Sequence, residues 1–403
     1  MKRTAMYLVF LLSALVMSCG SSSDQMEQAK KMSAEQNHEE AIRLYTIAIE
    51  GDGRDPEPWH QRGVERMKIG RLQDAEADLT YAIMLDGNKS ESYYQRALVR
   101  FKSGKNKESM ADINKAIQLE KSSADYYLFR AVLLALKGSN SEGVLDLDYA
   151  ISIRPASAVL YYYRGRMQQR CNETDEAISD YTQALKLDGK NHLCYHWRAR
   201  AHISRAEMKA AESDLAEALN QVNKAAKKYP DSSLLYYYSG YYKAQLAGLF
   251  TKKSYEKYRT SCLEDFEKGG EISATSGLEY YLVAEALFYL GDYTAAEQEF
   301  MNSIESQVAS TDDLVNEASA WLGLGNCAFG REDFETAIVN YTRCIELEGG
   351  DVSTAYSNRA WCKYRKNDRD GACADYKIAI ALGDPSAEEA LEHIGCTKTV
   401  VRK

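Results

Sequence analysis

Proline is scarce in this chain and basic charge is not in excess. Five prolines occur in 403 residues, so few positions force a helix to break. Lysine and arginine number 50 against 59 aspartates and glutamates, which gives a formal net charge of −9. A chain with this acidic balance and no basic stripe is a poor nucleic-acid binder. The two shortages favour a helical protein that binds neither DNA nor RNA.

Motifs that carry catalysis are also missing. The sequence has no glycine-rich phosphate loop, no HExxH and no GxSxG. His192 and His196 are i,i+4 neighbours that could share a metal, but Cys194 between them points to another face of the helix. His202 falls at a position that usually packs against a neighbouring helix. We therefore predict a protein that is not an enzyme and holds no cofactor and no metal.

Long hydrophobic runs are confined to the N-terminus. Lys2 and Arg3 precede Ala5–Met17, an uncharged apolar run that is too short to span a bilayer and is typical of a signal peptide. The run ends in Val16-Met17-Ser18-Cys19, which resembles a bacterial lipobox. The resemblance implies removal of residues 1–18, a lipid thioether on Cys19 and fatty acyl chains such as palmitate. The alternative is an ordinary signal peptide with an incidental cysteine.

Residues 19–24 would then join a lipid anchor to the folded part of the chain. The segment Gly20–Ser23 has the composition of a flexible tether. Residue 20 is glycine rather than aspartate, and by resemblance to lipoproteins of two-membrane bacteria this favours the outer membrane. The sequence leaves open whether the protein faces the periplasm or the cell surface.

A 34-residue pattern organises the rest of the chain. In Ala158–Asn191, Tyr161 and Gly165 stand at positions 4 and 8 of a first helical stretch. After a polar break, Ala177, Tyr181 and Ala184 stand at positions 20, 24 and 27. Those three share one face of a second helix because they are spaced by four and three residues. The unit therefore predicts a helix–turn–helix hairpin that needs neighbours to bury its apolar faces.

The same pattern returns eight more times. The nine repeats cover residues 22–55, 56–89, 90–123, 124–157, 158–191, 192–225, 277–310, 318–351 and 353–386. This skeleton resembles the tetratricopeptide repeat (TPR) family. The resemblance implies an all-α, right-handed superhelical α-solenoid of about ten repeats. Residues 387–403 would supply a capping helix and a tail.

The 34-residue period is interrupted between residues 226 and 276. Tyr229-Pro230-Asp231 predicts a stop and a turn, and Leu235–Leu246 predicts a first helix. A longer linker at Ala247–Lys253 would lead to a second helix around Tyr255–Lys268, closed by Gly269-Gly270. We interpret this stretch as an irregular, elongated repeat between repeats 1–6 (22–225) and repeats 8–10 (277–386).

Arginine at position 7 occurs together with aspartate at position 23. The six predicted pairs are Arg62 with Asp78, Arg96 with Asp112, Arg130 with Asp146, Arg164 with Asp180, Arg198 with Asp214, and Arg359 with Asp375. Repeats that lack the arginine also lack the aspartate, except that the irregular repeat has Asp265 but Ser239. We infer structural ion pairs between the two helices of one repeat. The alternative is a row of arginines for an anionic partner.

The resemblance implies that first helices line a concave groove with positions 2, 5, 9 and 12. The predicted groove residues are Tyr94, Phe101, Leu128, Tyr162, Arg166, His196, Arg200, Tyr237, Tyr241, Tyr281, Phe288, Trp361 and Tyr364. Aromatics with a polar tip suit protein interfaces. We predict a scaffold that binds other proteins or peptides of the cell envelope. The rival prediction is a glycan or peptidoglycan fragment stacked on the same aromatics.

Eight cysteines remain after Cys19, and an envelope protein can form disulfides. Cys171 and Cys194 fall at opposite ends of neighbouring first helices, too far apart to bond. Cys362 and Cys373 lie at equal distances from one hairpin turn, so they could bond if their faces agree. The sequence does not decide which cysteines pair.

Overall fold

The computed structural model describes residues 22–249, 252–306, 316–347, 351–384 and 386–396. Every regular element in these ranges is an α-helix, as the repeat pattern predicts. The chain divides into two compact units, Met1–Arg130 (unit 1) and Ala131–Lys403 (unit 2). The predicted signal peptide and Cys19 lie outside the described residues. Among the described helices, none combines the length and apolar character that a membrane span requires.

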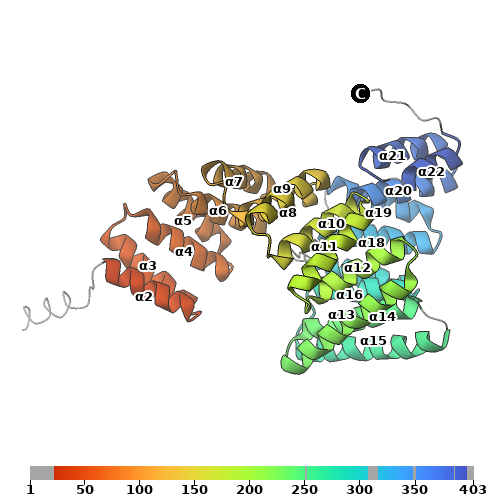
Figure 1. Cartoon of the computed structure of the whole chain (residues 1–403), viewed down its shortest axis with the longest axis horizontal. Coiled ribbons are helices and arrows are strands. Elements are labelled where there is room, and N and C mark those ends of the chain that lie inside the picture. Colours follow the sequence, from red (N-terminus) through yellow and green to blue (C-terminus); the bar gives the residue numbers. More distant parts are fainter. Residues whose placement is uncertain (1–21, 250–251, 307–315, 348–350, 385, 397–403) are drawn as a thin grey trace, which may run out of the picture. The chain divides into compact units, whose positions relative to one another are not determined.

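Helices that pack in successive pairs build both units (Figure 1). Unit 1 contains α2 (Ser22–Ala34), α3 (His38–Gly51), α4 (Pro56–Lys68), α5 (Leu72–Leu85), α6 (Ser90–Lys102) and α7 (Asn106–Leu119). The unit boundary falls within α8 (Ala124–Leu136). Unit 2 contains α9 (Asn140–Ile153), α10 (Ala158–Arg170), α11 (Thr174–Leu187), α12 (His192–Ser204), α13 (Met208–Lys228), α14 (Ser233–Leu249), α15 (Lys252–Ile272), α16 (Gly277–Tyr289), α17 (Tyr293–Glu305), α18 (Glu317–Gly330), α19 (Phe334–Glu346), α20 (Val352–Arg365), α21 (Arg369–Ala381) and α22 (Ser386–His393).

A left-handed residue at position 15 ends the first helix of each regular repeat. The residues with φ between 58° and 85° at this position are Gln36, Gly70, Gly104, Gly138, Asn172, Ala206, Gly291, Glu332 and Asn367. This conformation stops a helix and turns the chain, and glycine adopts it without the steric cost that a Cβ brings. The hairpin turns therefore follow from one backbone position in each repeat.

Glycine at position 8 lets the two helices of a repeat approach closely. A Cβ on Gly165 would lie 2.9 Å from Tyr181 Cε1, and one on Gly325 would lie 2.3 Å from Tyr341 Cε1. The large side chains at position 24 fill the hairpin interior. Those that are at most 1% exposed are Tyr45, Leu79, Ile113, Leu147, Tyr181, Leu215, Phe300 and Tyr341. Burial of these side chains is the main contribution to the stability of each hairpin.

The irregular repeat is more helical than its sequence predicts. The predicted linker at Ala247–Lys253 is wrong for most of its length, because α14 runs to Leu249 and α15 begins at Lys252. The predicted stop at Gly269-Gly270 is also wrong, because α15 continues to Ile272. Gly269 serves packing instead: a Cβ there would lie 2.7 Å from the Tyr237 ring.

The two ends of the described chain also differ in detail from expectation. Helix α2 begins at Ser22, so Ser22 and Ser23, predicted as tether, form its first turn, and Asp24 in that turn suits the positive end of a helix. At the other end, the predicted capping helix is α22. Leu391 and Ile394 of this segment are buried against α21, which covers the last apolar face of the stack.

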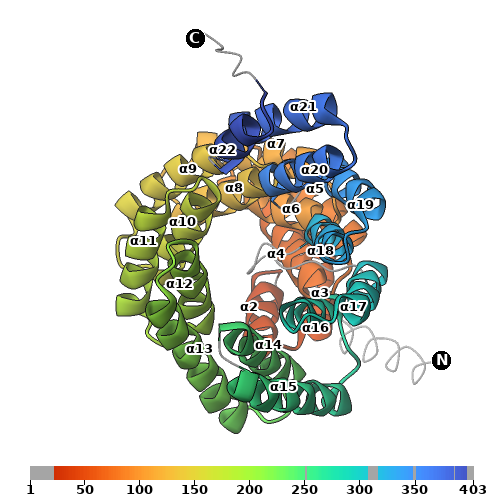
Figure 2. The same cartoon turned by 90° about the vertical axis from the view of Figure 1, so that its right-hand side faces the viewer.

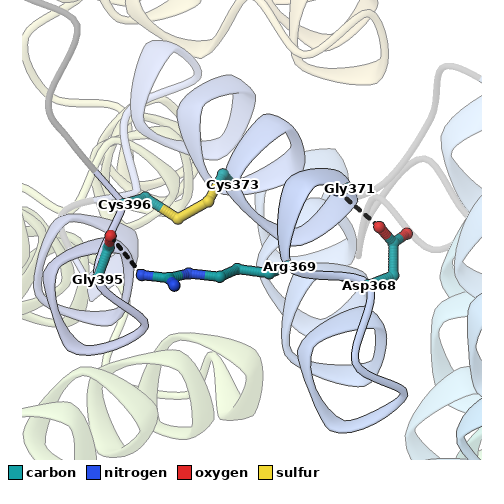
Figure 3. Close-up of a disulfide and its surroundings, with 6 residues drawn as sticks. All are labelled: Asp368, Arg369, Gly371, Cys373, Gly395 and Cys396. Atoms are coloured by element: carbon teal, nitrogen blue, oxygen red, sulfur yellow. Dashed lines mark hydrogen bonds between the residues drawn. A yellow bond between two sulfur atoms is a disulfide. The ribbon is translucent and has the colours of Figure 1, made fainter.

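A disulfide joins this cap to the last repeat (Figure 3). Cys373 of α21 bonds to Cys396, with their Cα atoms 5.9 Å apart. The candidate pair Cys362–Cys373 is therefore wrong. Cys362 is fully buried on another face, beside Tyr341 of the preceding repeat. Arg369 adds a second link, since its Nη2 donates to the Gly395 carbonyl at 2.6 Å.

Within unit 2, the first helices of successive pairs lie on the inner side of a curved stack (Figure 2). The stack curves far enough to bring the α10–α11 turn into contact with the segment that follows α21. Asn172, in the α10–α11 turn, donates from Nδ2 to the carbonyl of Gly383, which follows α21. The inner faces of α10 and α12 therefore lie opposite those of α18 and α20.

Candidate functional site

Five of the six predicted ion pairs are present in the structure. The shortest nitrogen–oxygen distances are 2.7 Å for Arg62–Asp78, 2.7 Å for Arg96–Asp112, 2.7 Å for Arg164–Asp180, 2.6 Å for Arg198–Asp214 and 2.8 Å for Arg359–Asp375. In each pair, Nε and Nη2 of the arginine donate to the two carboxylate oxygens. The pair Arg130–Asp146 would join residues of different units and stays a prediction.

A second cation, at position 11, supports several of these aspartates. Arg66 lies 2.7 Å from Asp78 and Lys363 lies 2.7 Å from Asp375. This position also resolves the exception in the irregular repeat, where Lys243 Nζ lies 2.7 Å from Asp265. The cation that faces Asp265 therefore stands at position 11 of the first helix, whereas position 7 is Ser239. The arginine–aspartate ladder is therefore a structural feature of the hairpins.

A pocket of about 420 Å³ opens on the inner side of unit 2. Residues of α10, α12, α14, α16, α18 and α20 line it, together with Asp351 at the start of α20. Six predicted groove residues meet there: Arg166, His196, Arg200, Tyr241, Tyr281 and Phe288. The volume suits one or two side chains of a partner rather than a folded surface.

The other predicted groove residues lie elsewhere. Tyr237 is wrong as a groove residue, because its ring packs on Gly269 and its hydroxyl bonds Thr275 Oγ1 at 2.9 Å. Tyr162 is 4% exposed and packs against the Tyr163 and Tyr181 rings in the hairpin interior. Both rings pack against the second helix of their own repeat instead of lining the pocket.

Five more predicted groove residues lie outside the pocket. The Trp361 ring contacts the tilted ring of Tyr364, with ring centroids 5.6 Å apart, and also approaches His393 of the capping helix. Tyr94 and Phe101 belong to unit 1 and pack against the Phe129 ring, with centroids 5.9 and 5.7 Å apart. Leu128, on α8, is half-buried. These residues form local packing contacts within their own units.

Several pocket residues were not predicted. Glu285 and Asn326 occupy position 9, a predicted groove slot, but a search for aromatic residues passed over them. Arg170 and Tyr289 occupy position 13, and Trp197 occupies position 6. The inner face of each first helix is therefore wider than positions 2, 5, 9 and 12. A scan of all inward positions for charged residues would have found Arg170 and Glu285.

Two arginines bracket the Trp197 indole in the pocket. The Arg166 guanidinium carbon lies 3.5 Å from the ring centroid, and that of Arg200 lies 4.9 Å from it. Arg166 is 2% exposed and donates to the Tyr162 hydroxyl at 2.9 Å. These contacts hold the cations in fixed positions by cation–π attraction. The pocket thus presents positive charge on a rigid aromatic support.

The acidic residues Glu285 and Asp351 line the same pocket, and the charge of Glu285 acts on Arg200 without a direct ion pair between them. Burial raises the pKa of Glu285, and its Oε1 accepts from the Tyr281 hydroxyl at 3.3 Å. Asp351 caps α20 by accepting from the Thr354 backbone N–H at 3.1 Å and from its hydroxyl at 2.8 Å. In the part of the chain that the structure describes, neither Arg170 nor Arg200 has a carboxylate oxygen within 4.0 Å.

The histidines are used in packing and hydrogen bonding. His192 Nδ1 lies 2.7 Å from the Tyr242 hydroxyl, and His202 Nδ1 lies 2.6 Å from Glu207. His196 is 3% exposed, and burial followed by the Arg200 and Arg166 charges holds its pKa well below the usual 6.5. Among the described residues, no three potential ligands gather as a metal site would require.

Comparison with known proteins agrees with the repeat period. Family models of the tetratricopeptide repeat match residues 90–123 and 158–191, and a further one matches residues 281–343. The first two segments coincide with repeats deduced from the sequence. A search of curated proteins finds no match to the chain.

Several solved structures have a fold that is similar to part or most of this chain. Yeast Tom70 is 15% identical, over 93% of this chain and 94% of that chain, with a TM-score of 0.40. The C-terminal part of a TPR repeat-containing protein from Cytophaga hutchinsonii is 16% identical, over 66% and 99%, with a TM-score of 0.46. YrrB, described as a TPR protein with an unusual peptide-binding site, is 18% identical, over 44% and 91%, with a TM-score of 0.40.

The helical hairpins, their 34-residue period and the matched segments lead to one assignment. TPR domains bind other proteins or peptides and generally work as scaffolds without catalysis. This chain belongs to the tetratricopeptide repeat family.

Proposed function

We propose that this protein is a membrane-tethered scaffold of a bacterial envelope that binds an extended segment of another protein in the inner pocket of unit 2. The observation that carries the proposal is the convergence of six first helices on one pocket with aromatic and arginine walls. Aromatic and arginine side chains in partly enclosed sites dominate the binding energy of protein interfaces. The pocket is therefore the place where a partner segment gains most from burial.

The tether is proposed from the N-terminal sequence. Ala5–Met17 followed by Cys19 supports export and lipidation, and several acyl chains hold a protein stably at a membrane surface. The bond between Cys373 and Cys396 supports the same location, because structural disulfides persist in oxidising compartments outside the cytosol. We place the anchor in the outer membrane on the basis of Gly20.

The pocket favours a protein partner over a glycan. A sugar ring would stack best on an open indole face. The Trp197 indole instead lies against the guanidinium groups of Arg166 and Arg200. Phe288 and Tyr281 remain on the wall, where they suit an apolar side chain of a peptide. A glycan is therefore the less favoured ligand, and the fluorescence measurement described below distinguishes it from a protein partner.

A photocrosslinking experiment tests the function. A photoreactive phenylalanine analogue replaces Phe288 in the mature, acylated protein, which is then mixed with detergent-solubilised envelope from the source cells. The matched control carries the same analogue at Val339, a 65% exposed residue of α19 in the same unit. We expect one protein to crosslink at Phe288 and not at Val339, because only Phe288 lines the pocket.

The crosslinked protein is then purified and titrated directly. Wild-type protein and the Val339→Ala variant should bind it with equal affinity, whereas Phe288→Ala should weaken binding by about tenfold. Equal crosslinking at both positions would contradict the proposal. Quenching of tryptophan fluorescence by peptidoglycan fragments, with no protein partner, would favour the glycan alternative. Mass spectrometry should find acyl chains on Cys19, and Cys19→Ala should release the protein from membranes.

A further inference from the structure

Arg170 and Arg200 line the pocket, and among the described residues no carboxylate oxygen lies within 4.0 Å of either guanidinium group. Arg166 and Arg170 come from α10, and Arg200 comes from α12. Arg170 Nη1 is buried and has no hydrogen-bond partner among the described residues. The chain as a whole has a net charge of −9, so a concentration of arginines at one place departs from its average composition.

Polar groups around these arginines are also left without partners. His196 Nδ1 and Trp197 Nε1 are buried, line the pocket and make no hydrogen bond to the described residues. His196 is itself 3% exposed. A buried polar group without a partner costs free energy, so a ligand that supplies a partner recovers it. An anion with two acceptor oxygens would serve both these groups and the arginines.

We propose that the pocket binds the carboxylate of an aspartate or glutamate side chain within a partner peptide, held by Arg170 and Arg200, with a neighbouring apolar side chain against Phe288. The inference rests on the proposed function, because it names the chemistry of the segment that the scaffold binds. It also assigns Arg170 and Arg200, neither of which belongs to the structural ladder, as binding residues.

A carboxylate fits this site better than a phosphate does. The planar guanidinium fork matches the two oxygens of a carboxylate. Glu285 and Asp351 also line the pocket, and they repel a doubly charged phosphate more strongly than a singly charged carboxylate. Burial and, after it, like-charge repulsion from Arg166 lower the pKa of Arg170 to about 10, and a bound anion would offset both effects.

A side-chain carboxylate also fits better than a chain terminus. Residues of the first helices from α10 to α20 line the pocket, and these helices lie along the inner side of the curved stack (Figure 2). An extended segment that crosses this face passes through the pocket and continues beyond it. The apolar part of the wall, which includes Tyr281 and Phe288, lies beside the arginines and accommodates the residue next to the acid.

The test selects peptides without assuming a partner. Random dodecapeptides are displayed within a surface loop of a carrier protein, so that they have no free terminus, and are panned against the full mature chain. We expect the selected sequences to share an aspartate or glutamate next to an aromatic or aliphatic residue. The best sequence is then made as a peptide blocked at both ends and titrated by calorimetry.

Replacement of the acid in that peptide by its amide should weaken binding by about tenfold or more, because hydrogen bonds to charged groups are lost. Arg170→Gln and Arg200→Gln should have the same effect, and Arg200→Lys an intermediate one, because lysine keeps the charge and loses the fork. The matched control is Arg343→Gln, on the outer helix α19, which should change nothing. Thermal unfolding of each variant checks that it is folded.

Each outcome decides between the two proposals. Peptides that require Phe288 but no acid would overturn the carboxylate inference and leave the scaffold function standing. Failure to select any peptide, or binding that ignores both Phe288→Ala and the arginine variants, would overturn both. Tighter binding of a phosphoserine version than of the aspartate peptide would overturn the assignment of a carboxylate.

Discussion

Helices α10 and α12 carry two kinds of arginine only a few residues apart. Arg164 and Arg198 turn toward the second helix of their own repeat and meet Asp180 and Asp214 within 2.7 and 2.6 Å. Arg200, two residues after Arg198, turns into the pocket. Among the described residues, no carboxylate oxygen lies within 4.0 Å of its guanidinium nitrogens. The two kinds are chemically identical and differ only in the helix face that they occupy.

The contrast separates charges that stabilise the fold from charges that are available to a ligand. A bidentate pair inside a hairpin satisfies both partners, and removing either leaves a buried charge behind. An arginine that forms no ion pair contributes less to the free energy of unfolding, and its N–H groups stay available to an anion. Position 7 is therefore structural in this chain, and positions 9 and 13 of α10 and α12 form the site.

The largest effect is expected at Arg164. Arg164→Ala should lower the free energy of unfolding by about 3–5 kcal/mol, because Asp180, which is 5% exposed, is left without its cation. Chemical denaturation measures this loss. The control is Lys186→Ala, on an exposed position of α11, which should stay within about 0.5 kcal/mol of wild type. Equal losses in both variants would remove the distinction between paired and unpaired cations.

A smaller loss is expected at Arg359, since its aspartate has a second partner. Asp375 lies 2.8 Å from Arg359 and 2.7 Å from Lys363. Arg359→Ala should therefore cost about 1–3 kcal/mol, less than Arg164→Ala, because the carboxylate keeps a cation. Adding Lys363→Ala should bring the loss to the Arg164→Ala level in the same denaturation measurement. A double variant no worse than the single one would show that position 11 does not support the ladder.

Acidification should act on the pocket through His196. The pKa of His196 is well below 6.5 in the folded protein, because of burial and the charges of Arg200 and Arg166. As pH falls below 6.5, the unfolded chain binds a proton that the folded chain does not, so the free energy of unfolding decreases. His196→Gln should lose less stability than wild type between pH 7 and pH 5, measured by denaturation at each pH. Parallel profiles would contradict a lowered pKa of His196 in the folded protein.

The smallest effect on stability is expected at Arg200. Arg200→Gln should leave the free energy of unfolding within about 1 kcal/mol of wild type, because it breaks no ion pair and removes only the cation–π contact with Trp197. The measurement is the same denaturation midpoint as for Arg164→Ala. A loss of several kcal/mol would mean that Arg200 belongs to the fold rather than to the site, and would erase the difference between the two kinds of arginine.

The sequence predicts the parts of the fold that depend on contacts within one repeat. The 34-residue spacing of small and large residues predicts the hairpins, and the coincidence of Arg164 with Asp180 predicts a contact across one turn. Such signals are readable because the partners stand at a constant separation in every repeat. The irregular repeat was less well predicted, because Gly269 permits close packing against Tyr237 rather than ending a helix.

The pocket could be predicted only in part, for a different reason. Six of its residues stand at inward positions of first helices, but its full wall depends on curvature that brings Asn172 to Gly383, across 211 residues of sequence. No local pattern encodes that closure. The link between Cys373 and Cys396 was missed likewise, because it depends on where α22 docks.

A double-mutant cycle tests the central claim most directly. The acidic peptide and its amide counterpart are each titrated against wild-type protein and the Arg200→Gln variant, and the coupling between the two changes is calculated. If the arginine holds the carboxylate, either change alone should weaken binding about tenfold, and the second should add little. Strictly additive losses would contradict the account, because they would show that the acid and Arg200 do not interact.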